Sequence, residues 1–313
     1  MTVAYPAVMP SVVSHVRAAD GTDLLVRRWP PAEVEAGGAW AGAPWGSVLL
    51  VHGLGEHSGR YEHVGDQLTG AGLEVEAYDH RGMGGSGGRR GDIERWSQYH
   101  DDLAERLAAI RHGAAGRPVV LYAHSLGGLI AAGYLLTDRP KPDVAVLTSP
   151  ALDSGLPGWK KRLAPALSRV LPTLAIPNGI KGESLSRDPD VAAKTVGDPF
   201  CVGVSTTRFG AEALTEQARV RALAPGGFGL PTLVLHGEDD DLVPVSASAV
   251  FVGVPLVERR TYAGLRHELH NEPEGPAILD EIVAWLRDKV IGAPGGRADV
   301  EAEEMDAVQT PIG

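Results

Sequence analysis

The chain has 313 residues, of which 43% are hydrophobic and 22% are charged, as is typical of a globular protein with a full apolar core. Its formal net charge of −11 argues against nucleic acid as a partner, because phosphate binding needs clustered lysine and arginine. The single cysteine, Cys201, excludes an internal disulfide, and no stretch reaches the roughly twenty apolar residues that span a bilayer. Because residues 1–10 lack a secretory signal pattern, we expect a cytoplasmic protein that is monomeric or a weak homodimer.

Short β-rich runs alternate with segments of helical spacing through most of the chain. The predicted strands are Val12–Arg17, Asp23–Trp29, Ser47–His52, Leu73–Tyr78, Pro118–Tyr122, Val144–Thr148, Pro231–His236 and Glu258–Tyr262. The predicted helices are Tyr61–Thr69, Gln98–His112, Leu126–Thr137, Val245–Phe251 and Pro273–Val290. This alternation predicts an α/β protein with a mostly parallel central sheet flanked by helices. A turn of Ala-Ala-Asp-Gly-Thr joins the first two strands and predicts an antiparallel hairpin at one sheet edge.

The alternation stops between residues 150 and 225. Short helical pieces there are interrupted by six prolines, Pro157, Pro165, Pro172, Pro177, Pro189 and Pro199. A segment of this length is too long for a simple connection, so we predict a helical cap inserted over the carboxyl edge of the sheet. The core is then built from residues 1–149 and 226–291, and residues 292–313 are expected to form a disordered tail.

A candidate nucleophile lies where a predicted strand meets a predicted helix. The motif is Ala123-His124-Ser125-Leu126-Gly127-Gly128, with alanine at the first small position, where glycine is usual. A sharp turn flanked by small residues lifts the Ser125 hydroxyl clear of the backbone, and the helix start below it favours developing negative charge. The motif therefore indicates nucleophilic catalysis, although an ordinary small-residue turn has the same composition.

A glycine-rich turn, His52-Gly53-Leu54-Gly55-Glu56-His57, follows an earlier strand. Such a turn can aim a backbone N–H at a tetrahedral oxyanion, and we assign the N–H groups of Leu54 and Leu126 as the two donors. The histidines of this region offer the alternative of a metal site built from His52, His57 and His63. No pair among them has the i, i+4 spacing of helical metal ligands, so neither a metal nor a cofactor is expected.

The acid and the base are sought on the last two strand ends. Asp240 follows the strand that ends in His236-Gly237, with Asp239 and Asp241 as its competitors. His267 lies between the last predicted strand and the last predicted helix, with His270 as the competing base. The chain order Ser125, Asp240, His267 is the nucleophile, acid and base order of the α/β-hydrolase fold.

Six segments together resemble the monoacylglycerol lipase family, a branch of the serine hydrolases that includes lysophospholipase-like esterases. They are His52–Tyr61, Tyr78–Ser86, Ala123–Gly128, Asp198-Pro199, His236–Asp240 and His267–Pro273, and the resemblance spans most of residues 20–290. It implies an α/β-hydrolase fold and a pocket for a glycerol-like head group, with Glu56, Arg60 and His270 as lining residues. One departure is Thr195, where relatives often carry an aromatic residue.

The resemblance implies a serine hydrolase that cleaves monoacylglycerols or similar medium- or long-chain esters through an acyl-enzyme intermediate. The alternatives are a carboxylesterase or lysophospholipase of other substrate range, an acyltransferase, and a non-catalytic binding module. We expect the apolar cap stretches Leu163–Val170 and Leu171–Ile176 to shield an acyl chain and to touch lipid surfaces transiently.

Overall fold

The computed structural model describes residues 11–30 and 43–292. The tail predicted to be disordered, residues 292–313, lies outside these ranges except for Gly292. Within the described ranges, no helix has both the length and the apolar character needed to cross a membrane.

Eight strands form the central sheet in the order β1-β2-β4-β3-β5-β6-β9-β10. Their bounds are β1 Val12–Arg17, β2 Asp23–Trp29, β3 Gly46–Val51, β4 Leu73–Tyr78, β5 Val119–His124, β6 Val144–Thr148, β9 Thr232–Gly237 and β10 Val257–Tyr262. Strand β2 pairs antiparallel with β1 and β4, whereas every other neighbouring pair is parallel. The structure confirms the mostly parallel sheet and the hairpin at its edge.

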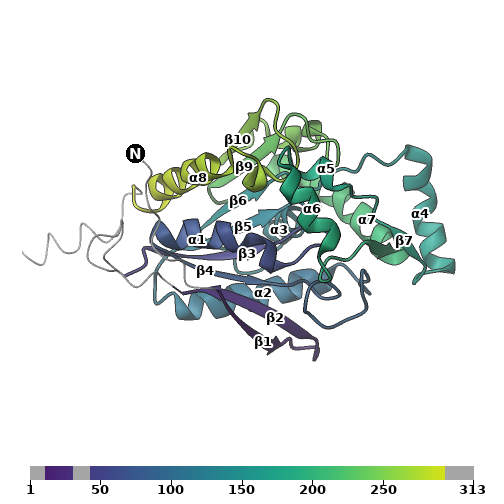
Figure 1. Ribbon diagram of the computed structural model, residues 1–313, viewed down its shortest axis with the longest axis horizontal. Helices are drawn as coiled ribbons and strands as arrows, with labels where there is room; N and C mark the ends of the chain where they lie inside the picture. Colours follow the sequence, from purple (N-terminus) through teal and green to yellow (C-terminus); the bar gives the residue numbers. More distant parts are fainter. Residues whose placement is uncertain (1–10, 31–42, 293–313) are drawn as a thin grey trace, which may run out of the picture.

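Helices cover both faces of this sheet (Figure 1). Side chains on one face pack with those of α1 (Glu62–Gly70) and α8 (Gly275–Val290), and side chains on the other face pack with α2 (Ser97–Gly113), α3 (Leu126–Leu135) and α7 (Thr207–Leu223). All six residues of β3 are buried because alternate side chains enter the two cores. This explains why the strand reads as a continuous apolar run.

The segment between β6 and β9 forms the cap, at the carboxyl ends of the parallel strands (Figure 1). It contains α4 (Gly158–Val170), β7 (Ala175–Pro177), α5 (Gly182–Leu185), α6 (Pro189–Gly197) and β8 (Val204–Thr206). Strands β7 and β8 pair antiparallel, so the cap is not purely helical as the sequence predicted. Three-residue strands are too short to display a period of two, which explains why the pattern missed them.

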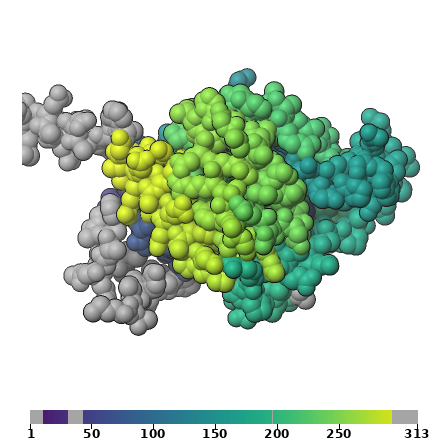
Figure 2. Space-filling view, turned by 90° about the horizontal axis from the view of Figure 1, so that it is seen from above, coloured from purple at the N-terminus to yellow at the C-terminus, as the bar shows by residue number. Residues whose placement is uncertain are grey.

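Helix α7 also falls within residues 150–225 but packs differently. Its side chains Phe209 and Val220 are buried in the same core cluster as residues of α2 and α3. By contrast, α4 has no buried residue and projects from the body of the molecule, in teal in Figure 2. The predicted cap segment therefore includes one helix that packs into the core.

Four short 3-10 helices lie in the connections between the main elements of the described chain. They are η1 (Ser58–Tyr61), η2 (Ala224–Gly226), η3 (Val245–Phe251) and η4 (Leu269–Asn271). Helix η3 corresponds to the predicted helix Val245–Phe251, and η1 and η4 flank the loops that carry the candidate site residues.

Candidate active site

Ser125 lies on a strained turn between β5 and α3. Its φ of 53° and ψ of −114° place a non-glycine residue in a left-handed region that is seldom occupied. A Cβ at Gly127 would lie 2.3 Å from the carbonyl oxygen of Val51, and one at Gly128 would lie 2.9 Å from Cα of Pro150. The turn therefore needs glycine at both positions, whereas Ala123 is accommodated as the fully buried residue before the turn.

Three side chains from separate loops meet at this turn. The Oγ of Ser125 lies 2.8 Å from Nε2 of His267, and Nδ1 of His267 lies 2.6 Å from Oδ2 of Asp240. All three residues are buried, with exposed fractions of 4–7%. The structure thus brings together the three residues that the sequence singled out, at hydrogen-bonding distances that permit proton transfer between serine and imidazole.

Asp240 is held in place by donors on its own loop and on β9. Its Oδ1 accepts from the backbone N–H groups of Leu242 and Val243, at 3.0 and 2.9 Å, and His236 Nε2 lies 3.2 Å from Oδ2. Burial alone would raise the pKa of Asp240, but the interaction with His267 and these hydrogen bonds outweigh it and lower the pKa far below its ordinary value. Asp240 therefore stays ionised.

The two competing aspartates face elsewhere. Asp239 is exposed, and the Asp241 carboxylate accepts a hydrogen bond from Ser184 Oγ at 3.1 Å. Neither carboxylate is hydrogen-bonded to His267, so the geometry distinguishes Asp240 from its neighbours.

The imidazole of His267 lies in a strongly negative environment. Burial by itself would lower the pKa of His267, but the charge of Asp240 and its hydrogen bond oppose this and raise the pKa above the ordinary value of 6.5. A raised pKa means that the site stabilises an imidazolium, which is the form created when the ring takes the serine proton.

The turn after β3 lies directly against the candidate nucleophile. A Cβ at Gly53 would lie 3.2 Å from Cβ of Ser125, so the next residue, Leu54, begins beside the serine. Leu126 is the first residue of α3, where a backbone N–H has no acceptor within the helix. These positions support Leu54 and Leu126 as oxyanion donors, which stays a prediction.

The inner part of the cap is bonded to this same turn. The N–H of Val202 donates to the carbonyl of Gly55 at 2.7 Å, and Asn178 Nδ2 donates to the carbonyl of Val202 at 2.8 Å. Gly55 has a φ of +72°, and a Cβ there would lie 2.6 Å from the Val202 carbonyl oxygen. A second bond joins His57 Nε2 to Asp198 Oδ2 at 2.7 Å. The cap therefore closely contacts the turn that carries Leu54.

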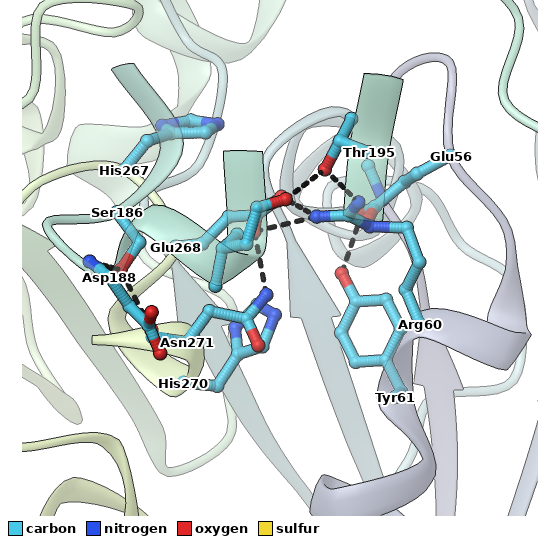
Figure 3. Close-up of polar contacts among 12 residues, drawn as sticks. Glu56, Arg60, Tyr61, Ser186, Asp188, Thr195, His267, Glu268, His270 and Asn271 are labelled. Atoms are coloured by element: carbon cyan, nitrogen blue, oxygen red, sulfur yellow. Dashed lines mark hydrogen bonds and ion pairs between the residues drawn. The ribbon is translucent and has the colours of Figure 1, made fainter. Parts of the chain in front are cut away.

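Ser125 and His267 open into a cavity of about 280 Å³ between the core and the cap. An arginine and two glutamates are bonded together in its wall, as Figure 3 shows for Arg60 between Glu56 and Glu268. Arg60 Nε donates to Glu56 at 2.9 Å, one terminal nitrogen donates to both oxygens of Glu268 at 2.8 Å, and the other donates to Thr195 Oγ1. Thr195, where the family often has an aromatic residue, is thus a partner of Arg60.

Glu56 also holds the turn that carries Leu54. Its Oε1 accepts from the N–H of Gly53 and from the hydroxyl of Tyr61, the latter at 2.7 Å. Burial would raise the pKa of Glu56, but the charge of Arg60, the nearby imidazoles of His124 and His52 and the Tyr61 hydrogen bond together outweigh it and lower the pKa. Burial raises the pKa of Glu268, and Arg60 only partly opposes this effect. The two carboxylates compete for one guanidinium.

His270, the third residue implied for the head-group pocket, lies behind the cavity wall. Its ring is 3% exposed and stacks on Tyr61, with ring centroids 4.8 Å apart. Neither ring nitrogen has a hydrogen-bond partner among the described residues, and burial lowers the pKa of His270 well below its ordinary value. Glu56 and Arg60 line the cavity, whereas His270 packs beneath it.

The alternative metal site of His52, His57 and His63 is not assembled. His52 Nε2 accepts from the backbone N–H of His80 at 2.9 Å, and His63 Nε2 faces the carbonyl of His270 at 3.1 Å. Together with the bond from His57 to Asp198, these contacts hold the three rings in separate hydrogen bonds.

A different group, His57, Asp198 and Cys201, has ligand atoms within 4.8 Å of one another. The N–H of Gly59 donates to Nδ1 of His57, so a neutral ring carries its proton on Nε2, which faces Asp198. With its proton on that atom, the imidazole has no lone pair to offer a metal between these side chains. The contact is better explained as a hydrogen bond between loop and cap.

Sequence reasoning missed several of these contacts, above all Glu268 and the pair His57–Asp198. Glu268 directly follows the proposed base, but its partner Arg60 is 208 residues away along the chain. The only available signal was its position beside the proposed base. Asp198 was noted as part of a family motif, without a partner.

Comparisons with known proteins agree with this geometry. The family described as serine aminopeptidase S33, Hydrolase_4, matches residues 42–274. A monoacylglycerol lipase of Mycolicibacterium smegmatis is 32% identical over 248 residues, covering 78% of this chain and 88% of the relative. The human monoglyceride lipase is 31% identical over 291 residues, covering 89% and 91% of the two chains. The resemblance to monoacylglycerol lipases is confirmed.

A solved structure gives the same result. The crystal structure of a Paleococcus ferrophilus monoacylglycerol lipase superposes with a TM-score of 0.71 at 32% identity, covering 78% of this chain and 95% of that one. Ser125, Asp240 and His267 also follow one another in the chain order that α/β-hydrolases use for nucleophile, acid and base. The chain is a serine ester hydrolase of the α/β-hydrolase fold, and it belongs to the serine aminopeptidase S33 family.

Proposed function

We propose that the protein hydrolyses monoacylglycerols, with Ser125 as nucleophile, His267 as general base and Asp240 as the acid that orients the base. The observation that carries this proposal is the continuous path from Ser125 Oγ through His267 to Asp240, with separations of 2.8 and 2.6 Å at the cavity wall. The names of the matched relatives support the substrate class.

In the proposed reaction, His267 takes the Ser125 proton as the hydroxyl attacks the ester carbonyl. The N–H groups of Leu54 and Leu126 stabilise the oxyanion, and His267 then protonates the departing glycerol. Water repeats the sequence on the acyl-enzyme and releases the fatty acid. Asp240 remains ionised throughout and holds the imidazole in the tautomer that presents Nε2 to serine.

We further propose that the cap docks transiently on lipid and guides the acyl chain into the cavity. The supporting observation is the exposed apolar surface of α4, where Trp159 is 61%, Leu163 56% and Val170 76% exposed. Lys160 lies next to the Trp159 ring and adds a positive charge that suits anionic lipid. The cytoplasmic location and the monomeric or weakly dimeric state stay predictions from composition.

The test is hydrolysis of 1-monoacylglycerols graded by acyl length, with glycerol and fatty acid both measured. We expect the two products in equal amounts, and Ser125→Ala to lower turnover on the order of 10⁶-fold, as in other serine hydrolases. Ser154→Ala is the matched control, because Ser154 does not line the cavity and should keep full activity. Turnover retained by a folded Ser125→Ala protein would show that another residue is the nucleophile.

A further inference from the structure

The described residues of the cavity wall include more acidic side chains than basic ones. Among the described residues that line the cavity, Arg60 is the only lysine or arginine, whereas three carboxylates, Glu56, Asp198 and Glu268, line it. Asp198 is bonded to His57. The two glutamates share the single guanidinium.

Arg60 has little left to offer a ligand. Its Nε is bonded to Glu56, one terminal nitrogen to Thr195 and the other to both oxygens of Glu268. A phosphate is usually recognised by an arginine that points two free N–H groups at it. Here the same groups are directed at protein oxygens.

Glu268 supplies the second negative charge. It is 3% exposed, and besides Arg60 it accepts from Asn271 Nδ2 at 2.6 Å. All its hydrogen-bond partners are donors, so these contacts satisfy the carboxylate form. Since Glu56 already balances the charge of Arg60, Glu268 leaves this part of the wall with an excess negative charge.

We propose that Glu268 determines leaving-group specificity, excluding acylglycerols that carry a phosphate and selecting uncharged alcohols that bear hydroxyl groups. This inference rests on the proposed monoacylglycerol hydrolysis and assigns its head-group selectivity to a residue outside the predicted set. A hydroxyl can donate to the unused lone pairs of Glu268 or Glu56. A phosphate meets repulsion there, and the described lining residues offer it no lysine or arginine besides Arg60, which is already bonded. Glu268 is a specificity residue and takes no part in proton transfer.

The experiment compares two substrates that differ only in the phosphate, 1-octanoylglycerol and 1-octanoylglycerol 3-phosphate, both below their micelle concentrations. The measured quantity is the ratio of their kcat/KM values in wild type and in Glu268→Gln. We expect the wild type to favour the neutral ester and the variant to narrow the ratio by about tenfold or more. Because Glu268 also interacts with His267, both rates will change, and the ratio removes that shared effect.

Glu272→Gln is the matched control. Glu272 is also 3% exposed and lies on the same loop, where it bonds Arg187 and the backbone of Arg266, but it does not line the cavity. We expect this variant to keep the wild-type ratio. An unchanged ratio in folded Glu268→Gln, or equal narrowing in both variants, would overturn the inference.

A second measurement covers the case in which Glu268→Gln does not fold. The wild type alone then supplies the test, because the excess negative charge predicts a higher kcat/KM for 1-octanoylglycerol than for its 3-phosphate. Equal kcat/KM values for the two substrates in wild type would overturn the inference in that case. A wild type that cleaves 4-nitrophenyl octanoate but neither glycerol ester would overturn the proposed function, and the inference with it.

Discussion

The loops of the core and helix α4 of the cap differ in how deeply their side chains are buried. In the core, Ser125, Asp240 and His267 are buried and each is bonded to another of the three. In α4 no residue is buried, and apolar side chains such as Trp159 face outward. The difference supports the proposal that the core performs the chemistry and that α4 contacts the lipid phase that holds the substrate. Changes in the core should therefore affect every ester, and changes in α4 only esters held at an interface.

The largest effect on the core side, short of removing the nucleophile, is expected for Asp240→Asn. The amide keeps the size of the side chain but loses the charge that stabilises the imidazolium and its tautomer. We expect kcat to fall about 10⁴-fold on both soluble and lipid-dispersed esters, which corresponds to about 5 kcal/mol. Steady-state rates on 4-nitrophenyl butyrate and on dispersed monooleoylglycerol measure this.

Asp241→Asn and Asp239→Asn are the controls for that loop, because neither carboxylate is bonded to His267. Both variants should retain most of the activity. If Asp241→Asn were as damaging as Asp240→Asn, the assignment of the acid would be wrong.

An intermediate effect is expected from pH. The base must be neutral to accept the serine proton. The pKa of His267 is raised because Asp240, Glu268 and Glu56 together outweigh the effect of burial. Activity is therefore lost as pH falls through that pKa, with kcat/KM on a soluble ester decreasing about tenfold per pH unit below it. We expect the midpoint to lie above the ordinary histidine value of 6.5. A midpoint below 6.5 in wild type would contradict this assignment of charges.

The smallest effect belongs to the cap. A triple variant, Trp159→Ser, Leu163→Ser and Val170→Ser, removes apolar surface that is exposed and contributes nothing buried. We expect about tenfold slower hydrolysis of monooleoylglycerol in vesicles, because lipid contact scales with apolar area, and an unchanged rate on soluble 4-nitrophenyl butyrate. Co-sedimentation with vesicles measures the loss of lipid binding independently of turnover.

Val252→Ser combined with Ile291→Ser is the control for the cap variant. These apolar residues are comparably exposed, at 67% and 54%, but lie outside the cap. If both variants lost the same activity on vesicle-bound monooleoylglycerol, α4 would have no special role. If the cap variant also hydrolysed the soluble ester more slowly, the proposed separation between core and cap would be wrong.

The chemistry-bearing part of the core was predictable from sequence because its signals are local. Small residues beside Ser125 mark its turn in the sequence. The structure shows why Gly127 is one of them, because a side chain there would collide with the carbonyl of Val51. Asp240 follows a strand, β9, whose buried apolar run marks its end, whereas His267 follows the more polar strand β10 and is marked by Gly264 in the loop after that strand. Chain order on a parallel sheet then implies that these loops meet at one edge.

What escaped prediction depends on pairing across the fold. The contact of Glu268 with Arg60 and that of His57 with Asp198 join segments separated by 208 and 141 residues. No periodicity encodes such pairs. His270 was implied as a pocket residue by resemblance, yet its ring stacks on Tyr61 and the residue does not line the cavity.

The backbone bond from Val202 to Gly55 has a consequence for attempts to exchange caps between related enzymes. The donor belongs to the cap and the acceptor to the turn that carries Leu54, so the two are built as one unit despite lying far apart in sequence. A chimera that imports a foreign cap while keeping the native turn would alter the support of that loop. Grafts should carry residues 52–61 together with 198–206.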